Sequence, residues 1–317
     1  MPRPRRTRRL LPIASLLALL LLASAVLALA TRTPVPDAGA GAATGRGEEV
    51  AWPGSGQAAV STTIGDVTPS SGGQHPVPIA SVTKIMTALV VLDREPLAVG
   101  DEGGTLTITA ADVLDTARRA ARSESVVTLR AGERLSERQA LLALLLPSAN
   151  NVAHVLAVRT AGSEPAFVDL MNARARGLGM SRTTYADASG VDPASRSTAA
   201  DQTVLARAAL QDPTFAWLVA QPSVVLPSAG RVRSTNRLLG HQGFVGLKTG
   251  STTPAGGCVV FAAWREVDGR PRLVVGAVLG QRGPVPLDGA FDAAQRLVAS
   301  VSDALPTGAP GSGLRQR

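Results

Sequence analysis

SVTKIMTALVVLD, residues 81–93, is the stretch that decides how this sequence is interpreted. Its apolar residues recur at helical spacing after an opening serine, so it predicts a helix. Residues three apart lie on one face of a helix, so the Ser81 hydroxyl can meet the Lys84 amine. A serine becomes a good nucleophile when a base takes its proton, and a lysine can be that base when burial or a nearby cation lowers its pKa. The stretch therefore predicts a helix that opens with a candidate nucleophile and its base.

The patterns on either side of this helix predict an α+β fold. Strand signals occur near both ends of the chain, and helical patterns dominate residues 110–212 between them. We expect an antiparallel sheet built from both ends of the chain and flanked by helices, plus an all-helical subdomain at about residues 100–215. In chain order, the clearest signals are short strands at 57–67, helices at 136–146 and 164–178, strands at 256–267 and 271–280 around the hairpin signal Asp268-Gly269, and a helix at 290–302.

Basic residues are used unevenly in this chain. There are 32 Lys and Arg residues, but only Lys84 and Lys248 are lysines. Arginine stays charged in proteins, whereas a desolvated lysine can lose its proton. The two lysines are therefore candidates for chemistry; the alternative is GC-rich codon usage with two lysines left by chance.

Composition excludes several classes of function. The formal net charge is +8, but five arginines lie within residues 1–30, and without them the remaining residues carry +3. A mildly basic body with 3% aromatic residues is a poor candidate for a nucleic-acid partner. The single cysteine excludes an internal disulfide. The three histidines are far apart in the sequence and do not have the spacing of metal ligands. We expect no metal and no cofactor, with Cys258 as a small buried hydrophobe and His154 as an ordinary packed or partly exposed residue.

The N-terminus has the pattern of an export leader. Residues 1–9 are basic, and residues 10–30 are uncharged and mostly Leu and Ala. The apolar stretch is long enough to span a bilayer, so either it stays as a single-pass anchor or it is cleaved near Ala30. The positive-inside rule places the body outside the cytoplasm in both cases. We expect a linker at 31–50, a globular domain at 51–305 and a disordered tail at 306–317.

Two further motifs accompany the first one. Ser148-Ala149-Asn150 follows an apolar helix and a proline, and Lys248-Thr249-Gly250 lies in an expected strand. Taken alone, each motif has an ordinary structural interpretation. Ser81 would cap a helix, Lys248 would be a solvated lysine on a strand, and Ser148 and Asn150 would cap the start of another helix. The chance that two random lysines fall in an S-x-x-K and a K-T-G is roughly one in a thousand, so the combination favours chemistry.

The three motifs together are a signature of penicillin-binding proteins and class A β-lactamases. Over roughly residues 75–280 the chain resembles the D-alanyl-D-alanine carboxypeptidase family of low-molecular-mass penicillin-binding proteins. It departs from the family at Ser234, where Asn is usual, at Val245, where Asp is usual, and at residues 185–190, which replace an Asn-Pro turn. The segments that carry the resemblance are PIASVTKIMTA (78–88), LALLLPSAN (142–150), MNARARGLGM (171–180), STNRLL (234–239) and GLKTGST (246–252).

The resemblance implies a β-lactamase/penicillin-binding-protein-like fold and a serine mechanism. Ser81 would attack the penultimate D-Ala of a peptidoglycan stem peptide that ends in D-Ala-D-Ala, and Lys84 would be its base. Ser148 would relay a proton to the leaving amine, and Asn150 would orient Lys84 and the substrate amide. The oxyanion hole would be the backbone N–H groups of Ser81 and Ser251.

The third motif would bind the substrate. By the resemblance, Lys248 and Thr249 would hold the terminal carboxylate, with Gly250, Ser251 and Thr252 continuing the binding strand. β-Lactam antibiotics would act as covalent inhibitors, and the enzyme would work in the bacterial cell envelope.

Two alternatives share the motifs. A class A β-lactamase usually needs a Glu-x-x-Leu-Asn loop, but Glu164 is followed by Pro-Ala-Phe-Val, and Ala149 stands where those enzymes favour Asp. A catalytically silent penicillin-binding sensor, tethered by the leader, would keep the motifs without turnover. Release of D-Ala, fast penicillin hydrolysis, or a stable adduct without peptide turnover would distinguish the three.

Overall fold

The computed structural model describes residues 50–62, 69–71, 73–267 and 269–304. These residues all belong to one structural unit, Gly47–Arg317. The expected leader, nearly all of the expected linker, and the expected tail lie outside the described ranges. Among the helices that are described, none is both long and apolar enough to cross a membrane.

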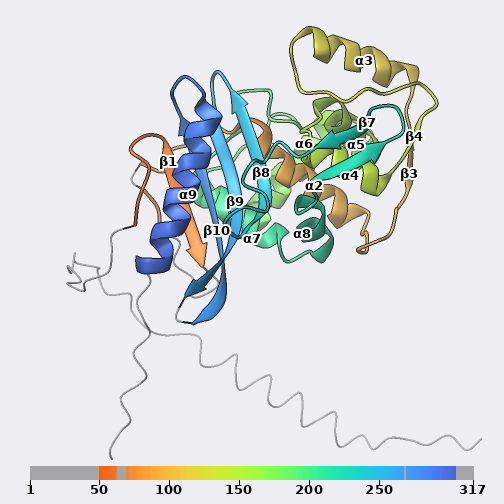
Figure 1. Ribbon diagram of the computed structural model, residues 1–317. Helices are drawn as coiled ribbons and strands as arrows, with labels where there is room; N and C mark the ends of the chain where they lie inside the picture. Colours follow the sequence, from red (N-terminus) through yellow and green to blue (C-terminus); the bar gives the residue numbers. More distant parts are fainter. Residues whose placement is uncertain (1–49, 63–68, 72, 268, 305–317) are drawn as a thin grey trace, which may run out of the picture. The chain divides into compact units, whose positions relative to one another are not determined.

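A four-stranded antiparallel sheet forms the centre of the fold, as the sequence predicted. Its order is β1-β10-β9-β8, so among the described strands the first pairs with the last (Figure 1). Val267 lies opposite Arg270 in the register of β9 and β10, which agrees with the predicted hairpin around residues 268 and 269. The strands are β1 (Gln57–Thr62), β8 (Phe244–Thr252), β9 (Gly256–Val267) and β10 (Arg270–Gln281).

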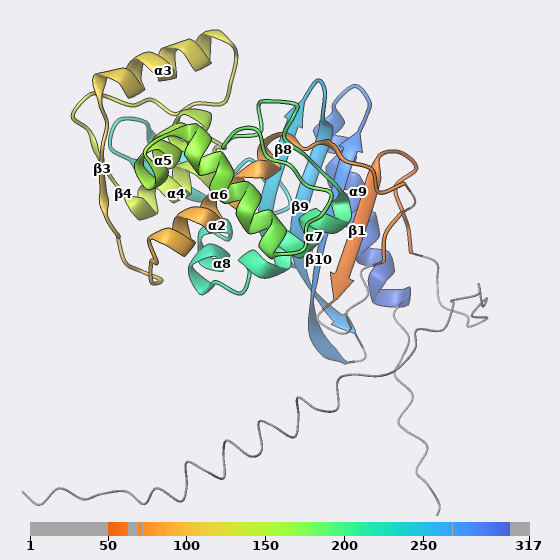
Figure 2. The same ribbon diagram turned by 180° about the vertical axis from the view of Figure 1, so that it is seen from behind.

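Helices cover both faces of this sheet. On one face the C-terminal helix α9 (Pro286–Ala304) packs on β9 and β10, with Phe261 of β9 in this core and its ring edge-on to Phe244. On the other face lie the 3-10 turn η1 (Ala80–Thr83), which contacts β8, and helix α7 (Ala199–Ala209), which packs on β1 and β10 (Figure 2). The sheet therefore carries one core on each side, and η1 lies directly against β8.

The helical part of the molecule also contains short strands, which the sequence pattern did not indicate. Three of its two-stranded sheets pair β2 with β5, β3 with β4, and β6 with β7. Each strand has only two to four residues, too few for a period-2 pattern to stand out. The elements are β2 (Val77–Pro78), α2 (Lys84–Arg94), β3 (Thr105–Thr107), α3 (Ala110–Ala121), β4 (Arg134–Ser136), α4 (Glu137–Leu145), α5 (Asn150–Ala161), α6 (Glu164–Gly177), β5 (Arg196–Ser197), α8 (Pro213–Val219), β6 (Ser223–Leu226) and β7 (Gly230–Arg233).

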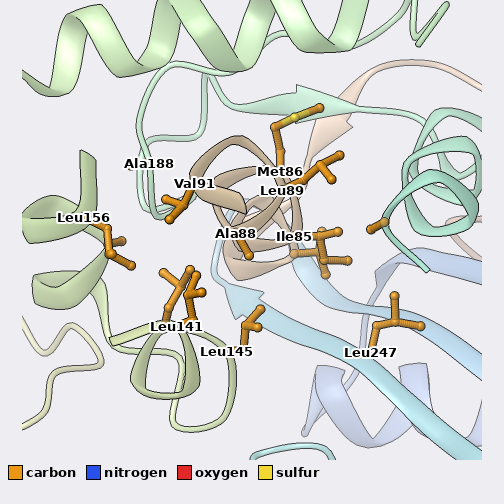
Figure 3. Packing of buried hydrophobic residues seen from close by; sticks show 14 of the residues in the cluster. Ile85, Met86, Ala88, Leu89, Val91, Leu141, Leu145, Leu156, Ala188 and Leu247 are labelled. Atoms are coloured by element: carbon orange, nitrogen blue, oxygen red, sulfur yellow. The ribbon is translucent and has the colours of Figure 1, made fainter. Parts of the chain in front are cut away.

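Helix α2 lies at the centre of the larger core. Every residue from Lys84 to Leu92 is buried, because α4, α5, α6, α7 and α8 surround the helix. Figure 3 shows Leu141 and Leu145 of α4, Leu156 of α5 and Leu247 of β8 around this helix. A helix that is buried on all sides cannot shift without repacking its neighbours, so α2 gives the first motif a fixed platform.

Candidate active site

Ser81 does not cap the helix, contrary to the reading in which it opens a regular helix at residue 81. It lies in η1, and α2 begins only at Lys84. Neither η1 nor α2 has a side-chain cap, so the Ser81 hydroxyl is not used on the backbone. Lys84 still follows Ser81 by one turn, and its Nζ lies 2.8 Å from Ser81 Oγ. The predicted meeting of hydroxyl and amine is therefore present.

The Lys84 amine has three oxygen partners. Its Nζ lies 2.8 Å from Ser81 Oγ, 2.7 Å from Asn150 Oδ1 and 2.8 Å from the carbonyl oxygen of Ser189. The two carbonyl oxygens can only accept, so each takes one N–H. A neutral amine has two N–H groups and one lone pair, so the lone pair is left for the one partner that can donate, the Ser81 hydroxyl. This set of partners suits a lysine that receives the serine proton.

The surroundings of Lys84 favour its neutral form. The side chain is fully buried, and burial is the main cause that lowers the pKa of Lys84 well below its ordinary value. The charge of Lys248 lowers this pKa further, whereas the carboxylates of Asp187 and Glu124 raise it. A base needs a lone pair at the working pH, and burial beside a second lysine supplies the conditions for one.

The second motif lies at the loop between α4 and α5. Asn150 is the first residue of α5; its Oδ1 accepts from Lys84, and its Nδ2 donates to Glu124 Oε2 at 3.1 Å. Ser148 is 6% exposed, and within the described part of the chain its Oγ has no hydrogen-bond partner. It also adopts a left-handed backbone conformation, with φ of 66°, which is uncommon for serine. A buried hydroxyl without a partner is costly, so its presence beside Asn150 indicates a use for it.

The third motif lies on β8, an edge strand of the sheet. Lys248 is buried; its Nζ donates to the carbonyl oxygen of Thr249 at 2.9 Å, and burial lowers its pKa to about 7. Thr249 is also buried, with its Oγ1 2.9 Å from Thr235 Oγ1. Further along the strand, Ser251 is exposed, and Thr252 accepts from the Ala255 N–H. The strand therefore runs from a buried cation to an accessible end.

Gly250 allows this strand to approach the first motif. A Cβ at this position would lie 2.6 Å from Ser81 N and 3.0 Å from Val82 N. Real Cβ atoms do not come this close to backbone, so any larger residue would push β8 and η1 apart. The glycine of the third motif thus brings the third motif against the nucleophile segment.

Two members of the site were missed by the sequence analysis. Ser189 contributes only its backbone carbonyl, and Glu124 lies behind Asn150 rather than in any motif. The loop that contains Ser189 is residues 185–190, where the sequence departs from the usual family turn. Asp187 shapes it, because its carboxylate accepts from the N–H and hydroxyl of Ser189 and from the Ser195 hydroxyl. That departure was the one signal that pointed to this loop.

Several other residues follow or extend the expectations. Cys258 is fully buried in β9, and burial raises the pKa of its thiol to about 11, as suits a packed residue. His154 is partly exposed, with its Nδ1 2.7 Å from Glu164 Oε2, and this hydrogen bond raises the pKa of His154. No cluster of three His, Cys, Asp or Glu side chains within the described ranges is arranged to hold a metal.

Residues 57–282 match the peptidase S11 family, D-alanyl-D-alanine carboxypeptidase. The chain belongs to this family. The match covers the sheet, the helical part and all three motifs. It confirms the family that the sequence resembles, a family of hydrolases that bind penicillin and act on D-Ala-D-Ala peptides of the cell-envelope peptidoglycan.

Relatives of this family member are named for different reactions. This chain is 36% identical over 216 residues to a D-alanyl-D-alanine endopeptidase of Pseudomonas aeruginosa, and the match covers 65% of this chain and 66% of that protein. It is 35% identical over 210 residues to the D-alanyl-D-alanine carboxypeptidase DacB2 of Mycobacterium tuberculosis, covering 64% and 67%. The chain thus spans about two thirds of the length of these relatives.

Solved structures support the fold. A C98A mutant of the Streptomyces K15 DD-transpeptidase superposes with a TM-score of 0.67 at 27% identity, over 80% of this chain and 98% of that one. The predicted penicillin-binding-protein-like α+β fold is therefore confirmed.

Proposed function

We propose that the chain is a serine-type D-alanyl-D-alanine carboxypeptidase that acts through an acyl-enzyme on Ser81. The observation that carries this proposal is the Lys84 amine, buried between two carbonyl acceptors and the Ser81 hydroxyl. Membership of the peptidase S11 family gives the substrate class, a peptide that ends in D-Ala-D-Ala.

Acylation begins at Ser81 and Lys84. Lys84 takes the hydroxyl proton while Ser81 Oγ attacks the carbonyl carbon of the penultimate D-Ala, and the backbone N–H groups of Ser81 and Ser251 stabilise the negative oxygen. The C–N bond to the terminal D-Ala then breaks, and its nitrogen receives a proton. Water hydrolyses the acyl-enzyme, again with a proton passing to Lys84, and this restores the Ser81 hydroxyl.

The remaining motif residues take supporting roles in this scheme. The unpartnered hydroxyl of Ser148 supports a relay that passes the proton from Lys84 to the leaving nitrogen. Asn150 holds Lys84 through its Oδ1. Lys248 and Thr249 bind the terminal carboxylate, on the strand continued by Gly250, Ser251 and Thr252. A protonated Lys248 both attracts the carboxylate and favours a neutral Lys84.

The rest of the chain completes the proposal. Residues 1–30 export the enzyme and either anchor it in the membrane through residues 10–30 or are cleaved near Ala30. Residues 31–50 form a linker, 51–305 the catalytic domain with its helical subdomain at about 100–215, and 306–317 a tail. The peptidoglycan of the cell envelope is then within reach of the enzyme.

A labelled penicillin tests the nucleophile and the base. The wild-type chain should become covalently labelled, and Ser81→Ala should not; labelling of Ser81→Ala would assign the nucleophile to another residue. Lys84→Arg should also abolish labelling, because arginine keeps the charge but cannot take the proton. Retained labelling in Lys84→Arg would remove the base from the scheme.

A diacetyl-Lys-D-Ala-D-Ala peptide tests the reaction. Release of D-Ala together with slow penicillin turnover supports the carboxypeptidase. Fast penicillin hydrolysis would instead show a β-lactamase, and a stable adduct without peptide turnover would show a sensor. Glu164, whose flanking sequence did not fit the loop of a class A β-lactamase, is engaged by His154 and the Ala188 N–H.

A further inference from the structure

The two carbonyl acceptors of Lys84 are each held by a carboxylate behind them. Asn150, which supplies one acceptor, donates its Nδ2 to Glu124 Oε2 at 3.1 Å. Ser189 supplies the other, and the N–H of its neighbour Ala188 donates to Glu164 Oε1 at 3.1 Å. Neither glutamate contacts Lys84 by a hydrogen bond that the structure records, so each acts through the group in front of it.

Glu124 decides which end of the Asn150 amide faces the lysine. An ionised carboxylate only accepts hydrogen bonds, so it can pair only with the Nδ2 end of the amide. The Oδ1 end then faces Lys84 and takes one of its N–H groups. The reversed amide would present two N–H donors to the amine and would leave one amine N–H without an acceptor. The carboxylate therefore sets the direction in which the Lys84 lone pair points.

Glu164 has the corresponding role for the loop of residues 185–190. Its Oε1 fixes the Ala188 N–H, and Thr87 of α2 donates its hydroxyl to the Ala188 carbonyl at 2.6 Å. Ala188, the residue before Ser189, is thus held at both its N–H and its carbonyl oxygen. His154 holds the other oxygen of Glu164.

Arg119 of α3 joins the two glutamates. Its Nη1 lies 3.2 Å from Glu124 Oε2 and its Nη2 lies 4.0 Å from Glu164 Oε2, while Asp115 orients its Nε at 2.5 Å. The Arg119 side chain is 12% exposed and that of Glu124 is 6% exposed. Helix α3 has no buried residue, yet the guanidinium of its Arg119 reaches both glutamates. The guanidinium therefore links the two carboxylates.

We propose that Glu124 and Glu164, joined by Arg119, are positioning residues that fix the two acceptors of the Lys84 amine and so aim its lone pair at Ser81. This inference rests on the proposed role of Lys84 as base. It adds to that role a set of residues outside the three motifs. It also assigns a function to α3, a helix without a fully buried residue, whose Val113 packs only partly buried against the core.

The charges around Lys84 make the proposal testable by pH. Among the described residues, the charged groups that act on it are Lys248 from β8, Arg119 from α3, Asp187 from the loop after α6, and Glu124 from the segment after α3. Glu124 raises the pKa of Lys84, so removing its charge lowers that pKa further. Acylation by a neutral lysine then extends to lower pH, which a change in packing alone would not produce.

Two substitutions at Glu124 separate orientation from charge. Glu124→Gln keeps an oxygen acceptor for Asn150 Nδ2, and the exposed Arg122 on its other side can move away. Glu124→Leu removes both the acceptor and the charge. We expect Glu124→Gln to acylate at close to the wild-type maximal rate. In its plot of acylation rate against pH, the fall in rate on the acid side (the acid limb) should lie at lower pH than in wild type. We expect Glu124→Leu to lose roughly tenfold in that rate, the effect of one lost charge-assisted hydrogen bond.

The experiment measures the second-order rate of acylation by a fluorescent penicillin across a pH series. Glu95→Gln is the matched control, because Glu95 is also paired with an arginine, Arg159 at 2.6 Å, but lies outside the site. It should keep both the rate and the acid limb. Circular dichroism melting identifies a variant that fails to fold. If Glu124→Leu does not fold, Glu124→Gln, which preserves the shape of the side chain, still tests the proposal through the pH dependence of its acylation rate.

The outcomes distinguish this inference from the proposed function. If wild type is labelled at Ser81 but Glu124→Leu keeps the wild-type rate, or Glu124→Gln keeps the wild-type acid limb, the positioning role is wrong. If Ser81→Ala is still labelled, the proposed function fails instead. At Glu164, Glu164→Leu should also slow acylation, and Glu164→Gln, which keeps an acceptor for the Ala188 N–H, should restore the rate; equal rates in both would refute its part.

Discussion

Replacement of Gly250 by alanine tests whether the close approach of β8 and η1 is required for acylation. The new methyl group would lie 2.6 Å from Ser81 N and 3.0 Å from Val82 N. Both neighbours are backbone atoms, so no side chain can rotate away to make room. The methyl would also lie on the N–H that we assign to the oxyanion hole.

The size of the effect follows from this distance. Ordinary contacts of a Cβ begin at 3.4 Å, so η1 and β8 must separate by about 0.8 Å to accept the methyl. A misplacement of about 1 Å at a reacting group can cost about a hundredfold in rate. We therefore expect Gly250→Ala to acylate about a hundredfold more slowly. Overpacking of this kind lowers the free energy of unfolding by about 1–3 kcal/mol.

The assay is the rate of acylation by a labelled penicillin, with urea unfolding of the same samples. Gly177→Ala is the control, because a Cβ at Gly177, the last residue of α6, meets nothing within 4 Å. It should keep the wild-type rate. A folded Gly250→Ala that acylates as fast as wild type would refute the argument, because the third motif could then move without consequence for the first.

Three further outcomes are expected from the same site. Lys248→Met removes a charge that lowers the pKa of Lys84, so the acid limb of acylation should move to higher pH; an unmoved limb would contradict the coupling. Gly190→Ala would place a Cβ 1.9 Å from the Ala80 carbonyl oxygen at φ of +81°, so unfolding in urea should show a loss of about 2–4 kcal/mol, and an unchanged midpoint would contradict the geometry. The hydrogen bond with Glu164 raises the pKa of His154 and lowers that of Glu164. The contribution of His154 to the free energy of unfolding is full below its ordinary pKa of 6.5 and is lost as the pH rises through its raised pKa. The contribution of Glu164 is present above its ordinary pKa of 4.5 and is lost as the pH falls through its lowered pKa. His154→Gln should therefore cost about 1 kcal/mol near pH 5.5 and less near pH 8.5, measured by unfolding in urea, and equal costs at both would contradict the pairing.

The sequence predicted the parts of the molecule that local patterns specify. Residues 136–146 and 164–178 became helices α4 and α6 within one residue of each predicted end, because capping residues and apolar spacing lie together there. The meeting of Ser81 with Lys84 also followed from spacing alone. The helix start was wrong by three residues, because Ser81 lies in a 3-10 turn and does not serve as a cap.

Other parts of the site could not be read from residue types. Ser189 contributes a carbonyl oxygen, a group that every residue has, so no pattern could single it out. Glu124 lies 26 positions from Asn150 in a segment without a motif, and only the fold brings the two together. Acidic residues also occur throughout the helical region, so a carboxylate that orients an amide looks like any solvated one until its neighbours are known.

Burial explains why the two lysines were kept in a chain that otherwise uses arginine. On the surface either residue supplies the same charge, and every basic residue other than these two lysines is an arginine. Lys84 and Lys248 are both buried, and the acceptors around each are few. A guanidinium carries five N–H donors and keeps its charge, whereas the Lys84 amine meets only three oxygen atoms, one of which must donate to it. Arginine at residue 84 would leave donors unpaired and offer no lone pair, so the chemistry of this position calls for lysine even in a chain that otherwise uses arginine.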